Sequence, residues 1–165
     1  STPLYSSAAS DVYKRQIPEG KEEVASLLDG VSRYWKHQTL AQLKESVGHI
    51  DMMVTGASAI TPSGIRFGKG HGYFDLEWAM LSSKGIADNS TVIIGAGHDC
   101  QVADVPVTVE EYDTAIDYIV TPTRIIETRH EFPRPSKGII WSRLAPGMRE
   151  QIPPVQELWC EVHCK

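Results

Sequence analysis

Cationic side chains alternate with glycines in one short stretch of this chain, and a carboxylate follows them. The stretch, residues 63–83, reads S-G-I-R-F-G-K-G-H-G-Y-F-D-L-E-W-A-M-L-S-S. Its candidate binding or catalytic residues are Arg66, Gly68, Lys69, Gly70, His71, Gly72, Tyr73 and Asp75. Glycines let a backbone approach a ligand closely, and unpaired N–H groups at a helix N-terminus favour negative charge. The pattern therefore predicts an anion-binding loop; a flexible turn is the alternative, and the spacing does not fit a Walker loop.

The neighbouring patterns place this loop between a strand and a helix. An apolar run at residues 50–54 predicts a buried strand before it. Phe74, Trp78 and Leu81 recur at the spacing of one helix face after it. Such a junction at the end of a strand is a common position for a ligand in an α/β protein.

The rest of the chain continues the alternation of helices and strands. Turn and apolar patterns predict helices at residues 20–29 and 39–47, strands at 91–94, 118–120 and 124–127, and an edge strand within 132–141. The second helix has Thr39 and Gln42 at capping-box spacing. The loop at residues 55–64 is rich in small residues and suits either a second backbone cradle or a plain connection. We expect a three-layer α/β domain with a mostly parallel sheet.

Composition limits the classes of function. The chain has 165 residues, 41% of them hydrophobic, which predicts one domain. A net charge of −5 leaves no basic surface for nucleic acid, and no apolar run is long enough to span a membrane. Three cysteines do not make a disulfide framework. These features predict a cytoplasmic protein, with Cys100 lining a site or packing rather than acting as a nucleophile.

The N-terminal residues require separate treatment. Residues 6–16 read S-S-A-A-S-D-V-Y-K-R-Q, which resembles the translation of a sequencing adapter; a native polar tail is the alternative. We therefore set residues 1–16 apart as non-native. We expect the domain to occupy residues 17–144 and a polar tail to occupy residues 145–165, in which the Cys160, His163 and Cys164 set is too small for a structural zinc site.

The central motif also carries a family resemblance. R-F-G-K-G-H-G-Y-F-D is similar to the R-x-G-x-G-x-G-Y-Y-D signature of the 5-formyltetrahydrofolate cyclo-ligase (methenyltetrahydrofolate synthetase) family. Residues 72–80, 98–104, 116–125 and 134–141 resemble the methenyltetrahydrofolate synthetase domain-containing branch, and the similarity extends over residues 17–158. The resemblance implies a fold similar to ribose-phosphate isomerase and CoA transferase domains. It also implies that an earlier, basic portion of the domain is absent, so that this chain is an incomplete C-terminal fragment.

The activity implied by the resemblance is a folate ligase reaction. ATP would phosphorylate the formyl oxygen of 5-formyltetrahydrofolate, and N10 would then attack the activated carbon to give 5,10-methenyltetrahydrofolate. The resemblance implies catalytic roles for Arg66, Lys69, His71 and Tyr73, and nucleotide contacts from residues 66 and 68–73. It also implies magnesium binding by Asp75 and Asp117. Simpler roles remain open: a helix N-terminal acid for Asp75, a turn acid for Asp117 and a core aromatic for Tyr73.

Two departures from the family signature leave two hypotheses. His71 stands where the enzymes have lysine, and a histidine near its reference pKa is mostly neutral at pH 7. Phe74 replaces the second tyrosine. The chain therefore comes either from an ATP- and magnesium-dependent cyclo-ligase, inactive as this fragment, or from a non-catalytic nucleotide- or folate-binding or regulatory domain. Another phosphorylated small-molecule enzyme on the same fold is a third possibility.

Overall fold

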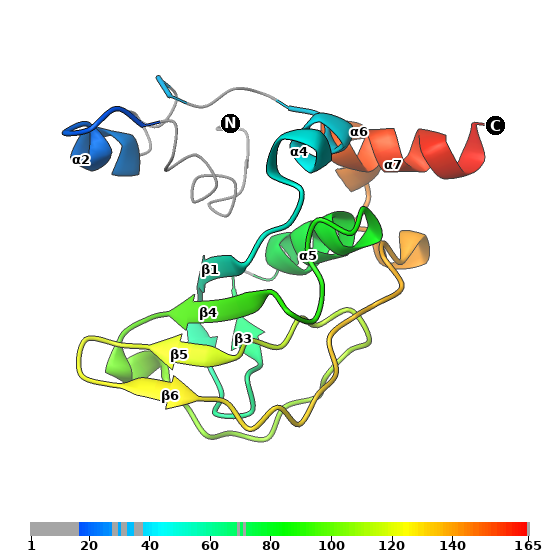
Figure 1. The fold of residues 1–165 in the computed structure, drawn as a ribbon. Helices are drawn as coiled ribbons and strands as arrows, with labels where there is room; N and C mark the ends of the chain where they lie inside the picture. The colour runs from blue at the N-terminus through cyan, green and yellow to red at the C-terminus, as the bar shows by residue number, and fades with distance from the viewer. Residues whose placement is uncertain are drawn as a thin grey trace.

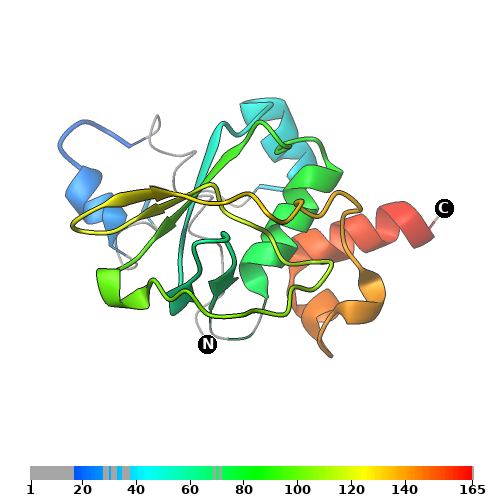
Figure 2. The same ribbon diagram turned by 90° about the horizontal axis from the view of Figure 1, so that it is seen from below.

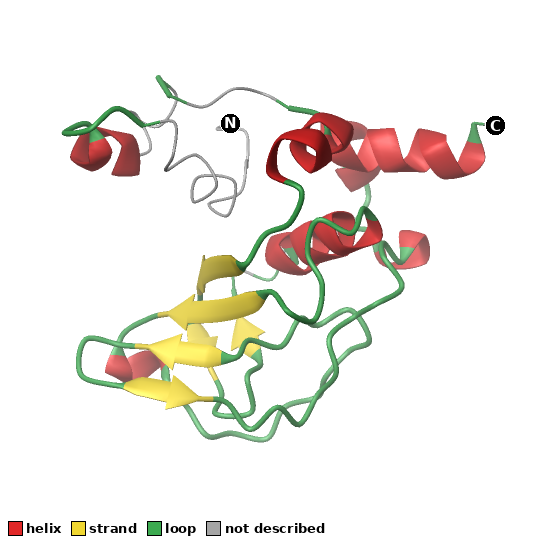
Figure 3. Ribbon diagram, in the orientation of Figure 1, coloured by secondary structure: helices red, strands yellow, loops and turns green. Residues whose placement is uncertain are grey.

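The computed structural model describes residues 17–27, 30, 33–34, 38–68, 70 and 72–164. Five α-helices lie in this part of the chain: α2 (Glu22–Ser26), α4 (Leu40–Val47), α5 (Tyr73–Ser83), α6 (Met148–Gln151) and α7 (Pro153–His163). The strands described are β1 (Met52–Gly56), β2 (Ala59–Ile60), β3 (Arg66–Phe67), β4 (Val92–Ala96), β5 (Tyr118–Val120) and β6 (Ile125–Glu127). Two short 3-10 helices, η2 (Asp99–Gln101) and η3 (Trp141–Arg143), complete the set shown in Figures 1 and 3.

A four-stranded sheet forms the centre of the fold. Its strand order is β1-β4-β5-β6; β1, β4 and β5 run parallel, and β6 pairs antiparallel with β5. Strands β2 and β3 form a separate antiparallel hairpin after β1. The predicted α/β class with a mostly parallel sheet is confirmed, and the arrangement is consistent with three layers. The specific similarity to ribose-phosphate isomerase and CoA transferase domains stays a prediction.

Helix α5 supplies most of the cover for one face of the sheet. Met53, Ile93 and Ile119 are at the centre of three adjacent strands and are 0% exposed, because they join Trp78 of α5 in one core cluster. Figures 1 and 2 both show α5 lying between the sheet and α7. The alternation along β1 leaves Met52, on the opposite face, 49% exposed. The buried face therefore fixes where α5, and the loop before it, must lie.

The capping box predicted from the sequence is present at α4. The Thr39 hydroxyl accepts from the N–H of Gln42, and the Gln42 side chain accepts from the N–H of Thr39. Gly48 follows the helix with a φ of 75°, a conformation that favours glycine. The predicted bounds of this helix are therefore confirmed, since the same residues that mark them in sequence satisfy its terminal groups.

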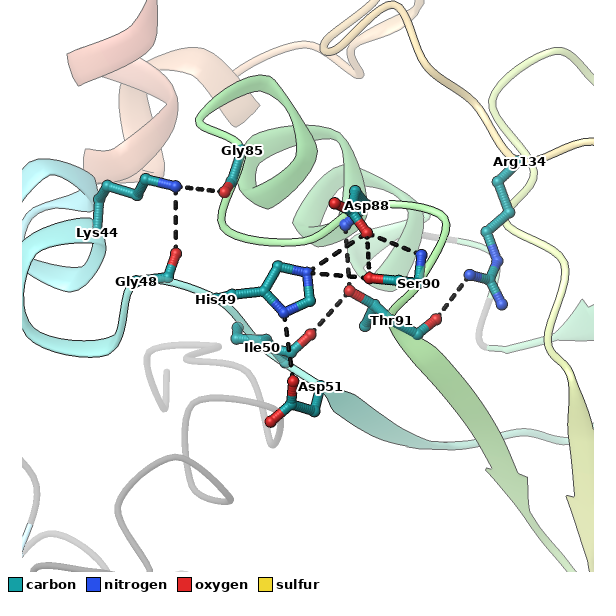
Figure 4. Close-up of polar contacts among 10 residues, drawn as sticks. All are labelled: Lys44, Gly48, His49, Ile50, Asp51, Gly85, Asp88, Ser90, Thr91 and Arg134. Atoms are coloured by element: carbon teal, nitrogen blue, oxygen red, sulfur yellow. Dashed lines mark hydrogen bonds and ion pairs between the residues drawn. The ribbon is translucent and has the colours of Figure 1, made fainter.

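Polar contacts join the amino-terminal ends of β1 and β4 (Figure 4). The Lys44 ammonium donates to the carbonyl oxygens of Gly48, at 3.2 Å, and of Gly85. His49 lies between two carboxylates, with Nδ1 3.4 Å from Asp51 and Nε2 3.4 Å from Asp88. This edge of the sheet is thus fastened by side chains within the protein.

The segment after β6 differs from its prediction. Residues 132–141, expected to contain an edge strand, form no strand; instead, the carbonyl of Pro135 accepts from Trp78 Nε1 at 2.8 Å. Residues 145–165, expected to form a tail, contain α6 and α7. The Glu157 carboxylate of α7 accepts from the N–H groups of Leu40 (3.1 Å) and Ala41 (3.3 Å), and so caps α4 from a distant part of the sequence. Among the described helices, none combines the length and apolar character needed to cross a bilayer.

Candidate functional site

Arg66 and Asp75 form a nearly buried ion pair beside the glycine loop. Arg66 lies on β3 and Asp75 in the first turn of α5, with Nη2 3.2 Å from Oδ2. Their side chains are 9% and 15% exposed. The other carboxylate oxygen of Asp75 accepts from the N–H of Thr114 at 2.9 Å. Asp75 therefore connects the hairpin, the helix and the segment before β5.

Burial and neighbouring charges act on this pair in opposite directions. Burial raises the pKa of Asp75, while Arg66 and the N–H of Thr114 lower it and the Asp113 carboxylate raises it. Burial lowers the pKa of Arg66, and the charges of Asp75, Glu77 and Asp113 oppose that change. The Asp113 carboxylate therefore adds negative charge near the Arg66 and Asp75 pair.

One donor of Arg66 has no acceptor. Its Nε atom is buried and makes no hydrogen bond with any residue that the structure describes. A buried donor without a partner is costly, so such an atom in a native site suggests a group that is absent from the structure. The free donor lies on the residue that the sequence identified as an anion-binding candidate.

Two glycines of the loop have a left-handed backbone conformation. Gly70 has a φ of 81°, and Gly72, which precedes α5, has a φ of 63°. A Cβ atom added at either position would meet nothing within 4 Å. The N–H groups of Gly70, Gly72 and Phe74 donate to no residue in the described part of the chain. The backbone at Gly70 and Gly72 is therefore uncrowded, and its N–H groups are available in the described part of the chain.

The structure does not test every residue of the motif. Lys69 and His71 lie outside the described residues. Tyr73 is the first residue of α5 and is half-buried, so both its ligand-contact and its core roles stay open. Gly68 lies against Arg66: a Cβ atom there would be 3.2 Å from Nη1.

Asp117 has different partners from Asp75, and its predicted magnesium role stays a prediction. Asp117 precedes β5, where Oδ2 accepts from the N–H of Ile93 at 2.7 Å and from the Arg134 guanidinium. Its Oδ1 lies 3.6 Å from His130 Nδ1. Figure 4 shows Arg134 at the same edge, donating to the Thr91 carbonyl. Asp117 therefore fastens an arginine at the amino-terminal edge of the sheet.

Asp113 is the residue that sequence reasoning missed. It lies directly before Thr114, whose N–H binds Asp75, and four residues before Asp117. The available signal in the sequence is the run of acidic residues E-E-Y-D at 110–113. Within the described residues, no three His, Cys, Asp or Glu side chains are grouped as a ready-made metal site.

The His98 and Cys100 loop shows no catalytic dyad. Cys100 is exposed, and the contact between the two residues joins the N–H of Cys100 to His98 Nδ1 at 3.4 Å. Because this bond uses the cysteine backbone, it does not activate the thiol. The geometry agrees with the structural or lining role expected for Cys100.

Comparison with known proteins adds a family relationship. Residues 5–122 match the sequence model of the 5-formyltetrahydrofolate cyclo-ligase family. This match includes residues 5–16; our adapter interpretation of residues 1–16 concerns positions outside the described residues and stays a prediction.

The curated relatives carry a common description. A methenyltetrahydrofolate synthase domain-containing protein from Homo sapiens is 44% identical over 110 residues, which are 66% of this chain and 28% of that protein. Proteins with the same description from Mus musculus and Danio rerio are 44% and 41% identical over 110 residues. The match thus spans less than a third of the length of these relatives.

Proposed function

This chain belongs to the 5-formyltetrahydrofolate cyclo-ligase family, and we propose that it supplies the phosphate-binding part of an ATP- and magnesium-dependent ligase that forms 5,10-methenyltetrahydrofolate from 5-formyltetrahydrofolate. One observation carries the proposal: within the described part of the chain, the buried Arg66 Nε has no acceptor, and the N–H groups of Gly70 and Gly72 beside it donate to no residue. Both features suit a polyphosphate. We place this reaction in the cytoplasm, as the composition predicts.

The residues of this site have complementary roles in the proposed reaction. Arg66 and the N–H groups at the start of α5 hold the negative charge of the phosphates and orient the group to be transferred. Lys69 adds a second cation, as the sequence predicts. Burial of the Arg66 and Asp75 pair keeps water away from these contacts, which strengthens their electrostatic effect.

The carboxylates fit a magnesium ion. Each oxygen of Asp75 makes one hydrogen bond and so retains a lone pair, and Asp113 lies close enough to raise its pKa. A magnesium ion bound there would neutralise charge on the phosphates. We therefore propose Asp75 and Asp113 as the metal-binding carboxylates, since Asp117 is committed to Arg134 elsewhere.

A non-catalytic nucleotide- or folate-binding domain is the second candidate. It is favoured by His71 in the lysine position of the signature, and by the domain-containing description of the relatives. Such a domain would keep the anion-binding loop and lose turnover.

A pair of measurements separates the two functions. Protein expressed from the complete gene is mixed with ATP, Mg²⁺ and 5-formyltetrahydrofolate, methenyltetrahydrofolate absorbance is followed, and ATP binding is measured by calorimetry. Turnover supports the ligase, ATP binding without turnover supports the binding domain, and absence of ATP binding rejects both.

Variants test the assigned residues. Arg66→Gln should weaken ATP binding more than about tenfold, because it removes a charge-assisted contact. Arg129→Gln is the matched control, since the ion pairs of Arg129 with Asp104 and Glu131 are both exposed. Asp113→Asn should weaken Mg²⁺ binding and Asp117→Asn should not; the reverse result would return Asp117 to the site.

A further inference from the structure

The guanidinium of Arg66 is held against an aromatic ring. Its central carbon lies 4.5 Å from the centroid of the Phe74 ring, and Phe74 is 7% exposed. Phe74 and Asp75 are consecutive residues in the first turn of α5. One therefore contacts the face of the guanidinium while the other binds its edge, which fixes the group in two directions.

Gly68 lies against the end of the Arg66 guanidinium. A side chain at this position would approach Nη1 to 3.2 Å, a distance that forces one of the two groups to move. The glycine therefore leaves room on the side of Arg66 that faces the loop.

A second arginine in the same fold shows what is unusual about Arg66. Arg134 is also 9% exposed and lies 5.2 Å from the ring of Trp78, one helical turn after Phe74. All three of its nitrogens are used: Nε donates to Ala115 O, Nη1 to Thr91 O and Nη2 to Asp117. Arg134 thus has the same kinds of partner as Arg66, an aspartate and an aromatic ring, but each of its three guanidinium nitrogens makes a hydrogen bond.

Arg66 instead keeps unused donors in a fixed position. Among the described residues, its guanidinium makes one hydrogen bond, from Nη2 to Asp75, and the second oxygen of Asp75 accepts from Thr114. A guanidinium has five N–H donors, so most of its capacity remains available. Resting on the proposed function, we infer that Phe74 is a positioning residue, whose ring holds Arg66 ready to bind a phosphate oxygen.

The role requires a ring and does not require a hydroxyl. Phenylalanine and tyrosine rings both attract a guanidinium, so the Phe74 departure from the family signature preserves this contact. Leucine would fill much of the space without the attraction. Comparing Phe74→Tyr with Phe74→Leu therefore separates the cation–π contact from the packing of the side chain.

The test measures binding of ATP with Mg²⁺ to the 165-residue chain by calorimetry, alongside the melting temperature. Phe74→Leu should weaken binding about tenfold, as expected for loss of a desolvated cation–π contact, and Phe74→Tyr should stay within about twofold. Leu81→Val is the control for packing, because Leu81 lies in the same helix and is 6% exposed. It should lower the melting temperature without changing affinity.

A second readout keeps the inference separate from the proposed function. The Arg66 Nε–H should give an exchange-protected NMR signal, shifted by the Phe74 ring, that is retained in Phe74→Tyr and lost in Phe74→Leu even without nucleotide. If Phe74→Leu binds ATP as the wild type does, or keeps that signal, the positioning role is wrong. If the wild type shows the signal and binds no ATP, the proposed function fails while the positioning of Arg66 stands.

Discussion

Removal of the Asp75 carboxylate should destabilise the protein more than removal of any exposed acid. Asp75→Ala leaves Arg66, only 9% exposed, without its partner, and leaves the N–H of Thr114 without an acceptor. Breaking a buried ion pair from one side costs about 3–5 kcal/mol, and an unsatisfied buried N–H costs about 1–3 kcal/mol. The two losses share one site and do not add fully.

We expect Asp75→Ala to lower the free energy of unfolding by about 3–4 kcal/mol at pH 7. This is the lower part of the range for a buried ion pair, since the Arg66 and Asp75 side chains keep some contact with water. Asp75→Asn keeps an oxygen for Thr114 and should cost about 1–2 kcal/mol. Both values are measured by urea unfolding: if the dependence of the unfolding free energy on urea concentration is unchanged, the shift in the midpoint concentration gives the change in stability.

Asp104→Ala is the matched control for this experiment. Asp104 also pairs with an arginine, at 3.1 Å from Arg129, but the two side chains are 69% and 53% exposed. Such a pair contributes only about 0–1 kcal/mol. If Asp75→Ala costs no more than Asp104→Ala, the Arg66 and Asp75 pair does not hold β3 to α5 and the reasoning fails.

Three further outcomes follow from the same contacts. Burial raises the folded pKa of Asp75, so part of its stabilising contribution is present below its ordinary pKa and is lost as pH rises through the raised value, while the contact with Arg66 retains the rest at pH 7; urea unfolding should show the advantage of wild type over Asp75→Asn shrinking above about pH 4. Gly72→Ala, at a φ of 63°, should cost about 1–2 kcal/mol in urea unfolding without steric contact, and a neutral result would contradict the left-handed turn before α5. Glu157→Ala removes the acceptor for two N–H groups of α4 and should cost about 1 kcal/mol; hydrogen exchange at Leu40 should become faster, and unchanged exchange would show that α7 does not cap that helix.

The sequence predicted the elements whose signals are local. The capping box of α4 depends on Thr39 and Gln42, which are three residues apart, and both bonds formed as expected. The strands β1, β4 and β5 are apolar runs with a buried face, a pattern set by the strand itself. The left-handed conformation of Gly70 and Gly72 also follows from residue type, because few other residues adopt it.

Features that depend on distant contacts were not predictable in this way. Helix α7 begins with prolines and has an amphipathic pattern, yet it looked like a tail because nothing local showed that Glu157 would meet Leu40. Strand β3 is two residues long, and only its pairing with β2 defines it. Contacts of this kind have no signature in spacing or composition.

The choice between Asp113 and Asp117 shows the same limit at the candidate site. Both acids precede β5, and sequence alone offers no reason to prefer one as the partner of Asp75. The hydrogen bond from Thr114 to Asp75 brings the first close, while Ile93 and Arg134 hold the second at the sheet. Arg134 also packs on Trp78 and donates to the carbonyl of Ala115, so Asp117 affects the site through the position of its neighbours. Asp117→Asn should therefore lower stability and leave the affinity for Mg²⁺ unchanged in the molecules that remain folded.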